Sequence, residues 1–195
     1  MKTNNIFLVA IGLLLLSYTA NASDYVLDKN TSGVKWLAKK VTGQHHGTIA
    51  LSQGTLQVKD GNPSGGEFLM DMNSIVCEDL NDATWNQKLI GHLKSDDFFS
   101  VEKFSVAKLV LTNVKEKSGN TFTFSGDLTI KGTTNPIVFD AEVLISNNTA
   151  KAKGQMVIDR TLYNIRYGSG KFFENLGNKM IEDTFTLDFD LTAIK

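Results

Sequence analysis

The sequence predicts an all-β protein: a single domain of about eight antiparallel strands that form a barrel or a sandwich, with a short helical insert at about 84–99. Three observations lead to this prediction. Apolar and polar residues alternate along several segments, turn-forming residues separate these segments, and one segment has helical periodicity instead. Alternation with a period of two is typical of strands that bury one face. Closing such strands into a barrel removes the unpaired edges that promote aggregation.

The alternation is clearest in the second half of the chain. At 122–130 the even positions are apolar or glycine, and at 137–145 the odd positions are apolar. The segments at 150–158 and 181–191 repeat this pattern. Weaker strands are expected at 34–40, 49–51, 56–58, 66–72 and 104–111. Glycine, asparagine and serine clusters separate the runs, as at Ser118-Gly119-Asn120, and such residues favour hairpin turns.

The helical insert shows one apolar stripe. Thr84 and Gln87 have the spacing of a capping box, which predicts Thr84 as the N-cap. Trp85, Leu89 and Leu93 then recur every four residues and would share one face of a helix. Asp96-Asp97 is expected to end the helix, and Phe98-Phe99 to seat the next strand on the core. The helix would cover one open end of the barrel, either as a plug that completes the core or as a lid over a mouth.

The N-terminus has the three parts of a secretory signal peptide. Lys2 is followed by an apolar run at 6–16 and by Ala20-Asn21-Ala22, a small-residue cleavage site. The run is shorter than the ~20 residues that a membrane span needs. The sequence therefore predicts a signal peptide at 1–22, one mature domain at 23–195, a periplasmic or secreted protein, and no stable membrane anchor after cleavage. The alternative is a retained N-terminal anchor.

Composition narrows the classes of function. The formal net charge of the chain is −1, so no basic face is expected and nucleic acid is not a predicted partner. Cys77 is the single cysteine, so the chain can form no internal disulfide. Its stability must therefore come from packing.

Enzyme signatures are incomplete. Gly168-Ser169-Gly170-Lys171 resembles part of a phosphate-binding loop, but the positions that would complete the motif are Ile165 and Phe172. No G-x-S-x-G motif occurs. His45 and His46 are adjacent, and neighbours on a strand point to opposite faces, so the two could not easily bind one metal ion together. A polar turn is the simpler interpretation of the pair. The sequence predicts no catalytic residue, metal site or cofactor. An enzyme that uses His46 or His92 as a base is kept as an alternative.

The two arginines of the chain, Arg160 and Arg166, lie six residues apart. Arginine is suited to bidentate contact with a phosphate or a carboxylate. On one strand this spacing would put both side chains on the same face, with the hydroxyls of Tyr163 and Tyr167 nearby. The alternative is ordinary ion pairing with Asp159, Glu174 or Glu182.

The order of motifs resembles the YceI-like, polyisoprenoid-binding family of exported bacterial proteins. The resemblance covers nearly all of the mature chain, and its most specific parts are LKSDDFFSVEKF and GDLTIKGTTNPI. The other segments that carry it are YVLDKNTSGVKWLAKKVTG, HHGTI, GGEFLMDMNSI, GQMVIDRTLYNI and DTFTLDFDLTAI. Many relatives carry a V-R-G-R-F-like stretch where this chain has GQHHGTI at 43–49, so a head-group role for those basic residues does not carry over.

The resemblance implies a single lipocalin-like, extended antiparallel β-barrel of about eight strands. Its lumen would hold an isoprenoid-type lipid, polyprenyl or quinone-like, as ligand and partner. Apolar strand faces supply ten candidates for the lumen: Trp36, Phe68, Met70, Phe124, Leu128, Phe139, Val143, Met156, Phe185 and Leu187. Arg160, Tyr163, Arg166 and Tyr167 are the candidates for contact with a head group. A stress-related interaction protein with a solid core and no bound lipid is the alternative, because a solid core and a tunnel share one binary pattern.

Overall fold

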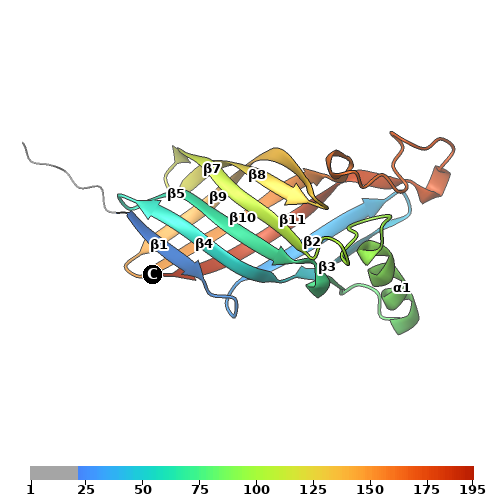
Figure 1. The fold of residues 1–195 in the computed structure, drawn as a ribbon, viewed down its shortest axis with the longest axis horizontal. Coiled ribbons are helices and arrows are strands. Elements are labelled where there is room, and N and C mark those ends of the chain that lie inside the picture. Colours follow the sequence, from blue (N-terminus) through green and yellow to red (C-terminus); the bar gives the residue numbers. More distant parts are fainter. Residues whose placement is uncertain (1–21) are drawn as a thin grey trace, which may run out of the picture.

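The computed structural model describes residues 22–195, which form an elongated barrel with one short helix at one end (Figure 1). The predicted signal peptide lies outside the described residues apart from Ala22, which begins the first strand. Within the described residues, none of the helices combines the length and the apolar character that a membrane-spanning segment requires.

The described residues contain eleven strands, all paired antiparallel in one sheet. Their bounds are β1 Ala22–Leu27, β2 Gly33–Lys40, β3 Gly43–Ile49, β4 Leu51–Lys59, β5 Asn62–Asp71, β6 Val76–Cys77, β7 Val106–Ser118, β8 Thr121–Ile130, β9 Thr133–Ser146, β10 Thr149–Asp159 and β11 Ile181–Ile194. Three 3-10 turns, Met72–Ser74, Arg160–Tyr163 and Gly177–Lys179, and the helix α1, Ala83–Lys94, complete the secondary structure.

The strands make eight walls of a closed barrel. β11 pairs with β2 along most of its length and with β1 at its end, so β1 and β2 together form one wall. β4 pairs with β1 and β3 pairs with β2, so β3 and β4 form the next wall. In the same way, β5 pairs with β4 and β6 pairs with β3, so β5 and β6 form the third wall. The predicted eight-stranded lipocalin-like barrel is therefore confirmed. Three of the eight walls consist of two strands each, which explains why the structure has eleven strands.

The first third of the chain departs from the predicted strand pattern. The segment at 43–49, interpreted as a polar turn around His45-His46, is strand β3, and the predicted strand at 49–51 is the junction between β3 and β4. β1 was not predicted. In β3 the more buried positions include His45 and Gly47, and in β1 the apolar Val26 is 61% exposed, so neither strand shows a clear alternation of apolar and polar residues.

The helix is confirmed as an element, but its predicted N-cap is wrong. Asp82 is the N-cap, and its carboxylate accepts a hydrogen bond of 3.0 Å from the backbone N–H of Trp85. The helix ends at Lys94, before Asp96-Asp97. Of the predicted stripe, Leu89 and Leu93 pack on the core, whereas Trp85 is 61% exposed and carries Lys88 over its ring. An aspartate accepts this bond as readily as threonine, so propensity alone does not separate the two N-caps.

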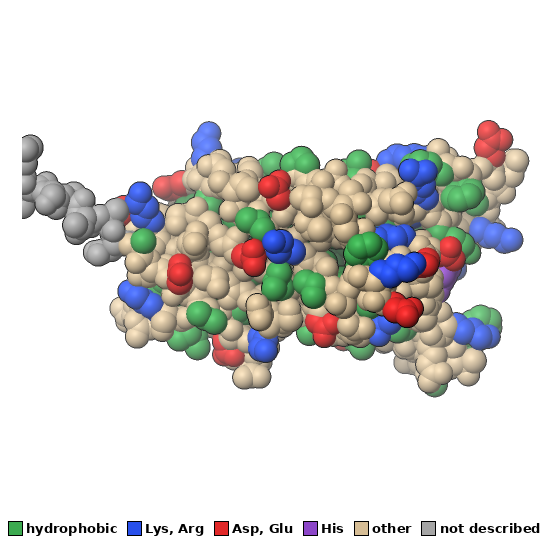
Figure 2. Space-filling model, viewed as in Figure 1, with side chains coloured by type: hydrophobic (Ala, Val, Ile, Leu, Met, Phe, Trp, Pro, Cys, Tyr) green, Lys and Arg blue, Asp and Glu red, His purple; other side chains and the backbone are tan. Residues whose placement is uncertain are grey.

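The inner faces of β8 and its neighbours follow the predicted alternation. Phe122, Phe124, Leu128 and Ile130 are buried. Phe124 stacks on Phe139 of β9, with ring centroids 5.5 Å apart and planes 15° apart. On the outside, positive and negative side chains are interspersed over the face seen in Figure 2.

Candidate ligand-binding lumen

The inward faces of the barrel leave two cavities, both lined almost wholly by apolar atoms. One lies at the end that carries α1, and the other lies farther into the barrel. Met70 on β5 lines both cavities, so they follow each other along the lumen. Their volumes are about 90 Å³ and about 60 Å³. Both cavities are therefore narrow, below the ~300 Å³ at which ordinary small-molecule sites begin.

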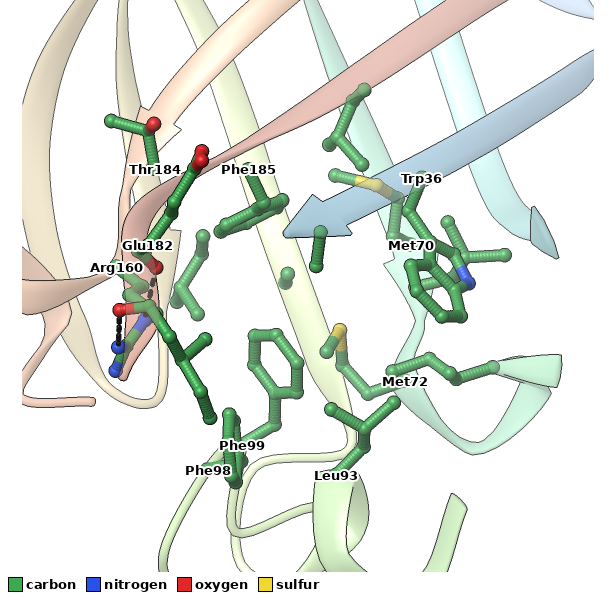
Figure 3. Close-up of a pocket in the computed structure, with 17 residues that line it drawn as sticks. Trp36, Met70, Met72, Leu93, Phe98, Phe99, Arg160, Glu182, Thr184 and Phe185 are labelled. Carbon is green, nitrogen blue, oxygen red and sulfur yellow. Dashed lines mark hydrogen bonds between the residues drawn. The ribbon is translucent and has the colours of Figure 1, made fainter. Parts of the chain in front are cut away.

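The cavity near α1 is enclosed by parts of the chain that are distant in sequence. Trp36 and Phe185 come from the barrel wall, while Leu93 comes from the last turn of α1 and Phe99 from the turn that follows it (Figure 3). The indole Nε1 of Trp36 donates a 3.0 Å hydrogen bond to the backbone oxygen of Val76. The ring therefore has its polar edge satisfied and can present its apolar face to the cavity.

The inner cavity combines aromatic rings with small residues. Phe68, Phe124, Phe139 and Phe189 are among its lining residues, beside Ala141 and Ala152. Phe189 meets Phe139 edge to face, with ring centroids 5.8 Å apart. The small side chains leave space that larger ones would fill.

Nine of the ten predicted lumen residues line one of these cavities. Trp36, Met70, Phe185 and Leu187 line the cavity near α1, and Phe68, Met70, Phe124, Phe139, Val143 and Met156 line the inner one. Leu128 is fully buried and lines neither, so it is packed core. Their contact with a lipid stays a prediction.

Several cavity residues were not predicted. Met72 and Ile75 lie where β5 gives way to a 3-10 turn, and there the period-two signal ends. Ile130 lay on the apolar face of the predicted strand at 122–130 and could have been included. Phe98 and Phe99, which were expected to seat the next strand on the core, pack on the core and also line the cavity beside α1.

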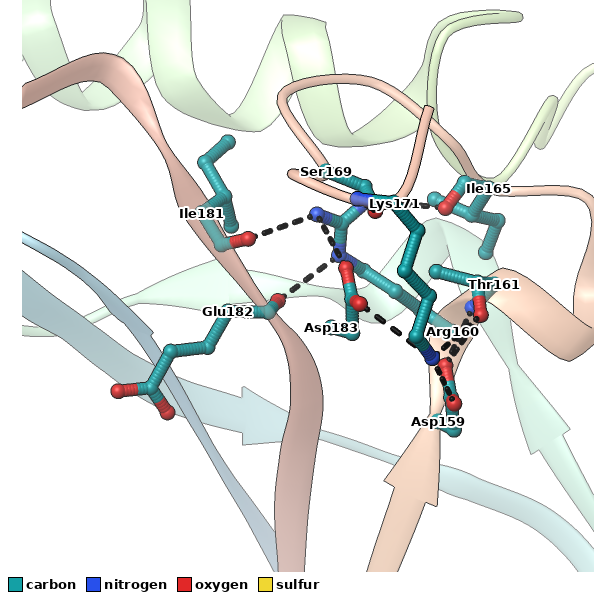
Figure 4. A network of polar contacts seen from close by, with 9 residues as sticks. All are labelled: Asp159, Arg160, Thr161, Ile165, Ser169, Lys171, Ile181, Glu182 and Asp183. Carbon is teal, nitrogen blue, oxygen red and sulfur yellow. Dashed lines mark hydrogen bonds and ion pairs between the residues drawn. The ribbon is translucent and has the colours of Figure 1, made fainter. Parts of the chain in front are cut away.

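Arg160 is 4% exposed, and its guanidinium forms hydrogen bonds with the backbone (Figure 4). Its Nε and Nη2 donate to the backbone oxygens of Glu182 and Ile181 at 3.0 and 3.1 Å, and its Nη1 donates to that of Ile165 at 2.8 Å. Asp183 lies 3.8 Å from Nη2. Burial lowers the pKa of Arg160, and the neighbouring carboxylates oppose this effect. The guanidinium thus joins the segment after β10 to the start of β11.

The prediction that Arg160 and Arg166 lie on the same face of one strand is wrong. β10 ends at Asp159, and Arg160–Tyr163 is a 3-10 turn, so the two arginines do not share a strand. Arg166 is exposed and lies over the ring of Phe172, 4.7 Å from its centroid. Tyr163 is buried, and burial raises the pKa of its hydroxyl. Asn164 has a left-handed backbone, which turns the chain between the two arginines.

An aromatic cluster joins α1 to the segment between β10 and β11. The rings of His92 and Tyr167 meet edge to face at 4.5 Å, and His92 contacts Phe98 at 4.9 Å. Tyr167 is 45% exposed, as is Phe172, and Phe173 is 49% exposed. The α1 end of the barrel therefore has an aromatic rim beside the apolar cavity.

The profile of the YceI-like domain matches residues 25–193, nearly the whole described chain. The chain belongs to the YceI-like family. Similar curated proteins include a UPF0312 protein of Photorhabdus laumondii, 29% identical over 155 residues, and protein YceI of Escherichia coli O157:H7, 28% identical over 155 residues. The matched region covers 74% of this chain in both cases, and 73% and 74% of the respective relatives.

Two solved structures share the fold. BcnA of Burkholderia cenocepacia superposes with a TM-score of 0.68 at 21% identity, over 86% of this chain and 99% of BcnA. A polyisoprenoid-binding domain from Saccharophagus degradans, implicated in plant cell wall breakdown, gives a TM-score of 0.61 at 17% identity, over 87% and 97% of the two chains. The profile match thus shows the family, and the two superpositions show the barrel fold.

Proposed function

We propose that this YceI-like protein is a periplasmic or secreted binding protein that holds an isoprenoid-type lipid, polyprenyl or quinone-like, in the barrel lumen. The observation that carries the proposal is the pair of apolar cavities, one behind the other, with Met70 in the lining of both. A slender, branched hydrocarbon chain matches this space better than a compact ligand does. The polyisoprenoid-binding domain of Saccharophagus degradans, which has the same fold, supports the choice of ligand.

Selectivity for the lipid would come from the shape of the lumen. Burying one CH₂ group from water is worth about 0.8 kcal/mol. A polyprenyl tail normally resides in a membrane, however, so its transfer into the barrel gains little hydrophobic free energy. The fit of the chain to Phe68, Phe139 and the alanines around them would therefore decide which lipid is retained.

The head group would remain at the rim. Arg160 and Tyr163 are buried, and the guanidinium of Arg160 already donates to three backbone oxygens. Of the predicted head-group residues, Arg166 and Tyr167 are thus the pair exposed to solvent, whereas Arg160 lines the outer cavity. Tyr167 contacts Phe98, which lines the same cavity, and this contact supports Tyr167 as a candidate for the head group.

The helix α1 would act as the lid rather than as a plug. No side chain of α1 is fully buried, and Gly91 has open space around it. Leu93 still lines the cavity, so the helix both closes the lumen and is weakly held. Elements with few buried apolar contacts are those that open most readily.

Native mass spectrometry tests the proposal on protein purified gently from its exporting host, followed by organic extraction and lipid analysis. A prenyl lipid at close to one molecule per chain is the expected result. A folded protein that carries no lipid, and takes up none when mixed with prenyl lipids in vesicles, would overturn the proposal and favour the interaction protein.

A pair of variants tests the site itself. Ala152→Leu adds a side chain inside the inner cavity, whereas Lys151→Leu adds a similar side chain to the outer face of the same strand. We expect Ala152→Leu to retain less lipid, or a shorter one, and Lys151→Leu to retain as much as the unmodified chain. Equal retention by both variants would place the lipid outside the inner cavity.

A further inference from the structure

Three side chains of different chemistry meet on the barrel wall near α1. His45 lies on β3, Cys77 ends β6, and Asp79 follows two residues later. His45 Nδ1 lies 2.8 Å from Asp79 Oδ2, and Cys77 Sγ lies 3.2 Å from Asp79 Oδ1. One nitrogen, one sulfur and one oxygen, a single atom from each residue, all lie within 4.8 Å of one another. The head-group and lumen residues take no part in this group.

The backbone around the group is held in place by close pairing of two strands. Gly47 on β3 pairs with Cys77 on β6, and a side chain at Gly47 would overlap the backbone oxygen of Val76. The N–H of Glu78 donates to the backbone oxygen of His46 at 2.9 Å. Asn86 of α1 donates from its side-chain amide to the backbone oxygen of Cys77, also at 2.9 Å. The three side chains therefore project from a fixed frame.

The carboxylate of Asp79 is held in place by hydrogen bonds. It accepts from the backbone N–H of His46 at 2.8 Å, and the ring of His45 and the thiol of Cys77 lie 2.8 and 3.2 Å away. The side chains of His45 and Asp79 are 28% and 19% exposed, and Cys77 is buried. The group is therefore open to ions from one side and closed on the other.

We propose that His45 Nδ1, Cys77 Sγ and a carboxylate oxygen of Asp79 bind a divalent transition metal ion of the zinc type. Thiolate and imidazole ligands suit zinc and its neighbours, whereas magnesium and calcium prefer oxygen alone. On binding, the thiol proton of Cys77 is released to solvent and the ring proton of His45 moves from Nδ1 to Nε2, so that both atoms can bind the metal ion. Three protein ligands leave a fourth tetrahedral position for water or another ligand.

The ligand atoms need only small movements to reach a metal ion. Zinc bonds of about 2.0 to 2.3 Å put tetrahedral ligand atoms roughly 3.3 to 3.8 Å apart. The contacts of 2.8 and 3.2 Å to Asp79 are already this short or shorter. Rotation of the two partly exposed side chains, His45 and Asp79, would bring their ligand atoms to these distances from the sulfur of Cys77. The wall of the barrel need not move.

Cobalt(II) is a suitable probe because a thiolate ligand gives it a strong ultraviolet charge-transfer band. The full exported protein, kept reduced with a non-thiol phosphine, is titrated with cobalt and then with zinc. We expect one cobalt per chain with the thiolate band, displacement of cobalt by zinc, and loss of the band in Cys77→Ser. His45→Gln and Asp79→Asn are each expected to weaken binding at least about tenfold, since even residues that only support ligands cost 10- to 100-fold.

The chain supplies its own control. His92 and Asp97 form a second histidine–carboxylate pair, with 3.2 Å between Nε2 and Oδ2, and Cys77 belongs to the first group alone. His92→Gln should leave the cobalt band and the affinity unchanged. Absence of the thiolate band in the unmodified chain, or an equal loss in His92→Gln and His45→Gln, would overturn the proposal. Circular dichroism identifies any variant that has not folded, and because the side chain of His45 is partly exposed, His45→Gln provides the test if Cys77→Ser does not fold.

Discussion

The Nη1 of Arg160 donates a 2.8 Å hydrogen bond to the backbone oxygen of Ile165, inside the protein. The residues lie five apart, and the bond closes the turn that leads away from β10. Because Arg160 also binds the backbone oxygens of Ile181 and Glu182, one side chain holds the segment at 160–170 against β11.

Replacing this side chain should destabilise the fold. In Arg160→Met three backbone oxygens lose their donor, and each unsatisfied buried group costs about 1–3 kcal/mol. We expect a clearly lower melting temperature. Arg166→Met is the matched control, because Arg166 is exposed and only stacks on Phe172. The free energy of unfolding of this variant should lie within about 0.5 kcal/mol of that of the unmodified chain. Equal melting temperatures for both variants would contradict the role of Arg160.

Two glycines should respond in opposite directions to alanine. A Cβ at Gly47 would overlap the backbone of Val76, so Gly47→Ala should separate β6 from β3 and lower the free energy of unfolding. Gly91 lies within α1 with open space around it, and Gly91→Ala should raise the helix propensity by about 1 kcal/mol. Chemical denaturation measures both changes. A stabilising Gly47→Ala would show that the close pairing of β3 and β6 does not persist in solution.

The ion pair of Asp159 and Lys171 should make stability depend on pH. Burial acts to raise the pKa of Asp159, but hydrogen bonds from Thr161 and Lys171, 2.9 Å away, outweigh it and hold the pKa below its ordinary value. A lowered folded-state pKa contributes stability above the unfolded pKa of about 3.9, and this contribution is lost as the pH falls through the folded value.

Asp159→Asn removes the charge and keeps an oxygen for Thr161. We expect this substitution to lower the free energy of unfolding by up to about 1 kcal/mol at neutral pH. The gap in melting temperature to the unmodified chain should close as the pH is lowered below about 4. Asp127→Asn, at an exposed position on β8, is the control. A gap that stays constant down to pH 2 would mean that the charge of Asp159 contributes nothing.

The aromatic rim should govern the exchange of lipid with membranes. Phe172 and Phe173 are 45% and 49% exposed at the α1 end of the barrel, and burying such a ring in a membrane surface is worth roughly 1.5–3 kcal/mol. Replacing both by serine should slow the transfer of lipid between the protein and vesicles by about tenfold or more.

The amount of lipid bound at equilibrium should not change, because neither ring lines a cavity. Val138→Ser, on the outer face of β9 and 66% exposed, is the control for lost surface hydrophobicity. Transfer that is unaffected by the double serine variant would place the doorway elsewhere.

The alternation in the sequence predicted the strands and their inward faces, and the family resemblance predicted that they close into a barrel. At 122–130 every even position except Gly126 is a large apolar residue, and a strand with that pattern has only one way to face a core. The same reasoning found nine of the residues that line the cavities. It failed where local signals compete, as at the N-cap of α1, where Asp82 and Thr84 are equally suitable by type.

By itself, the sequence determined the family, the eight-walled barrel and the apolar character of its interior, because these follow from alternation and motif order along the chain. Only the tertiary structure decided that Arg160 holds backbone oxygens inside the protein, that the interior contains cavities, and that His45 and Cys77 meet at Asp79. These features depend on contacts between residues far apart in the chain. Strand register and side-chain packing bring such residues together, and neither leaves a periodic signal in the sequence.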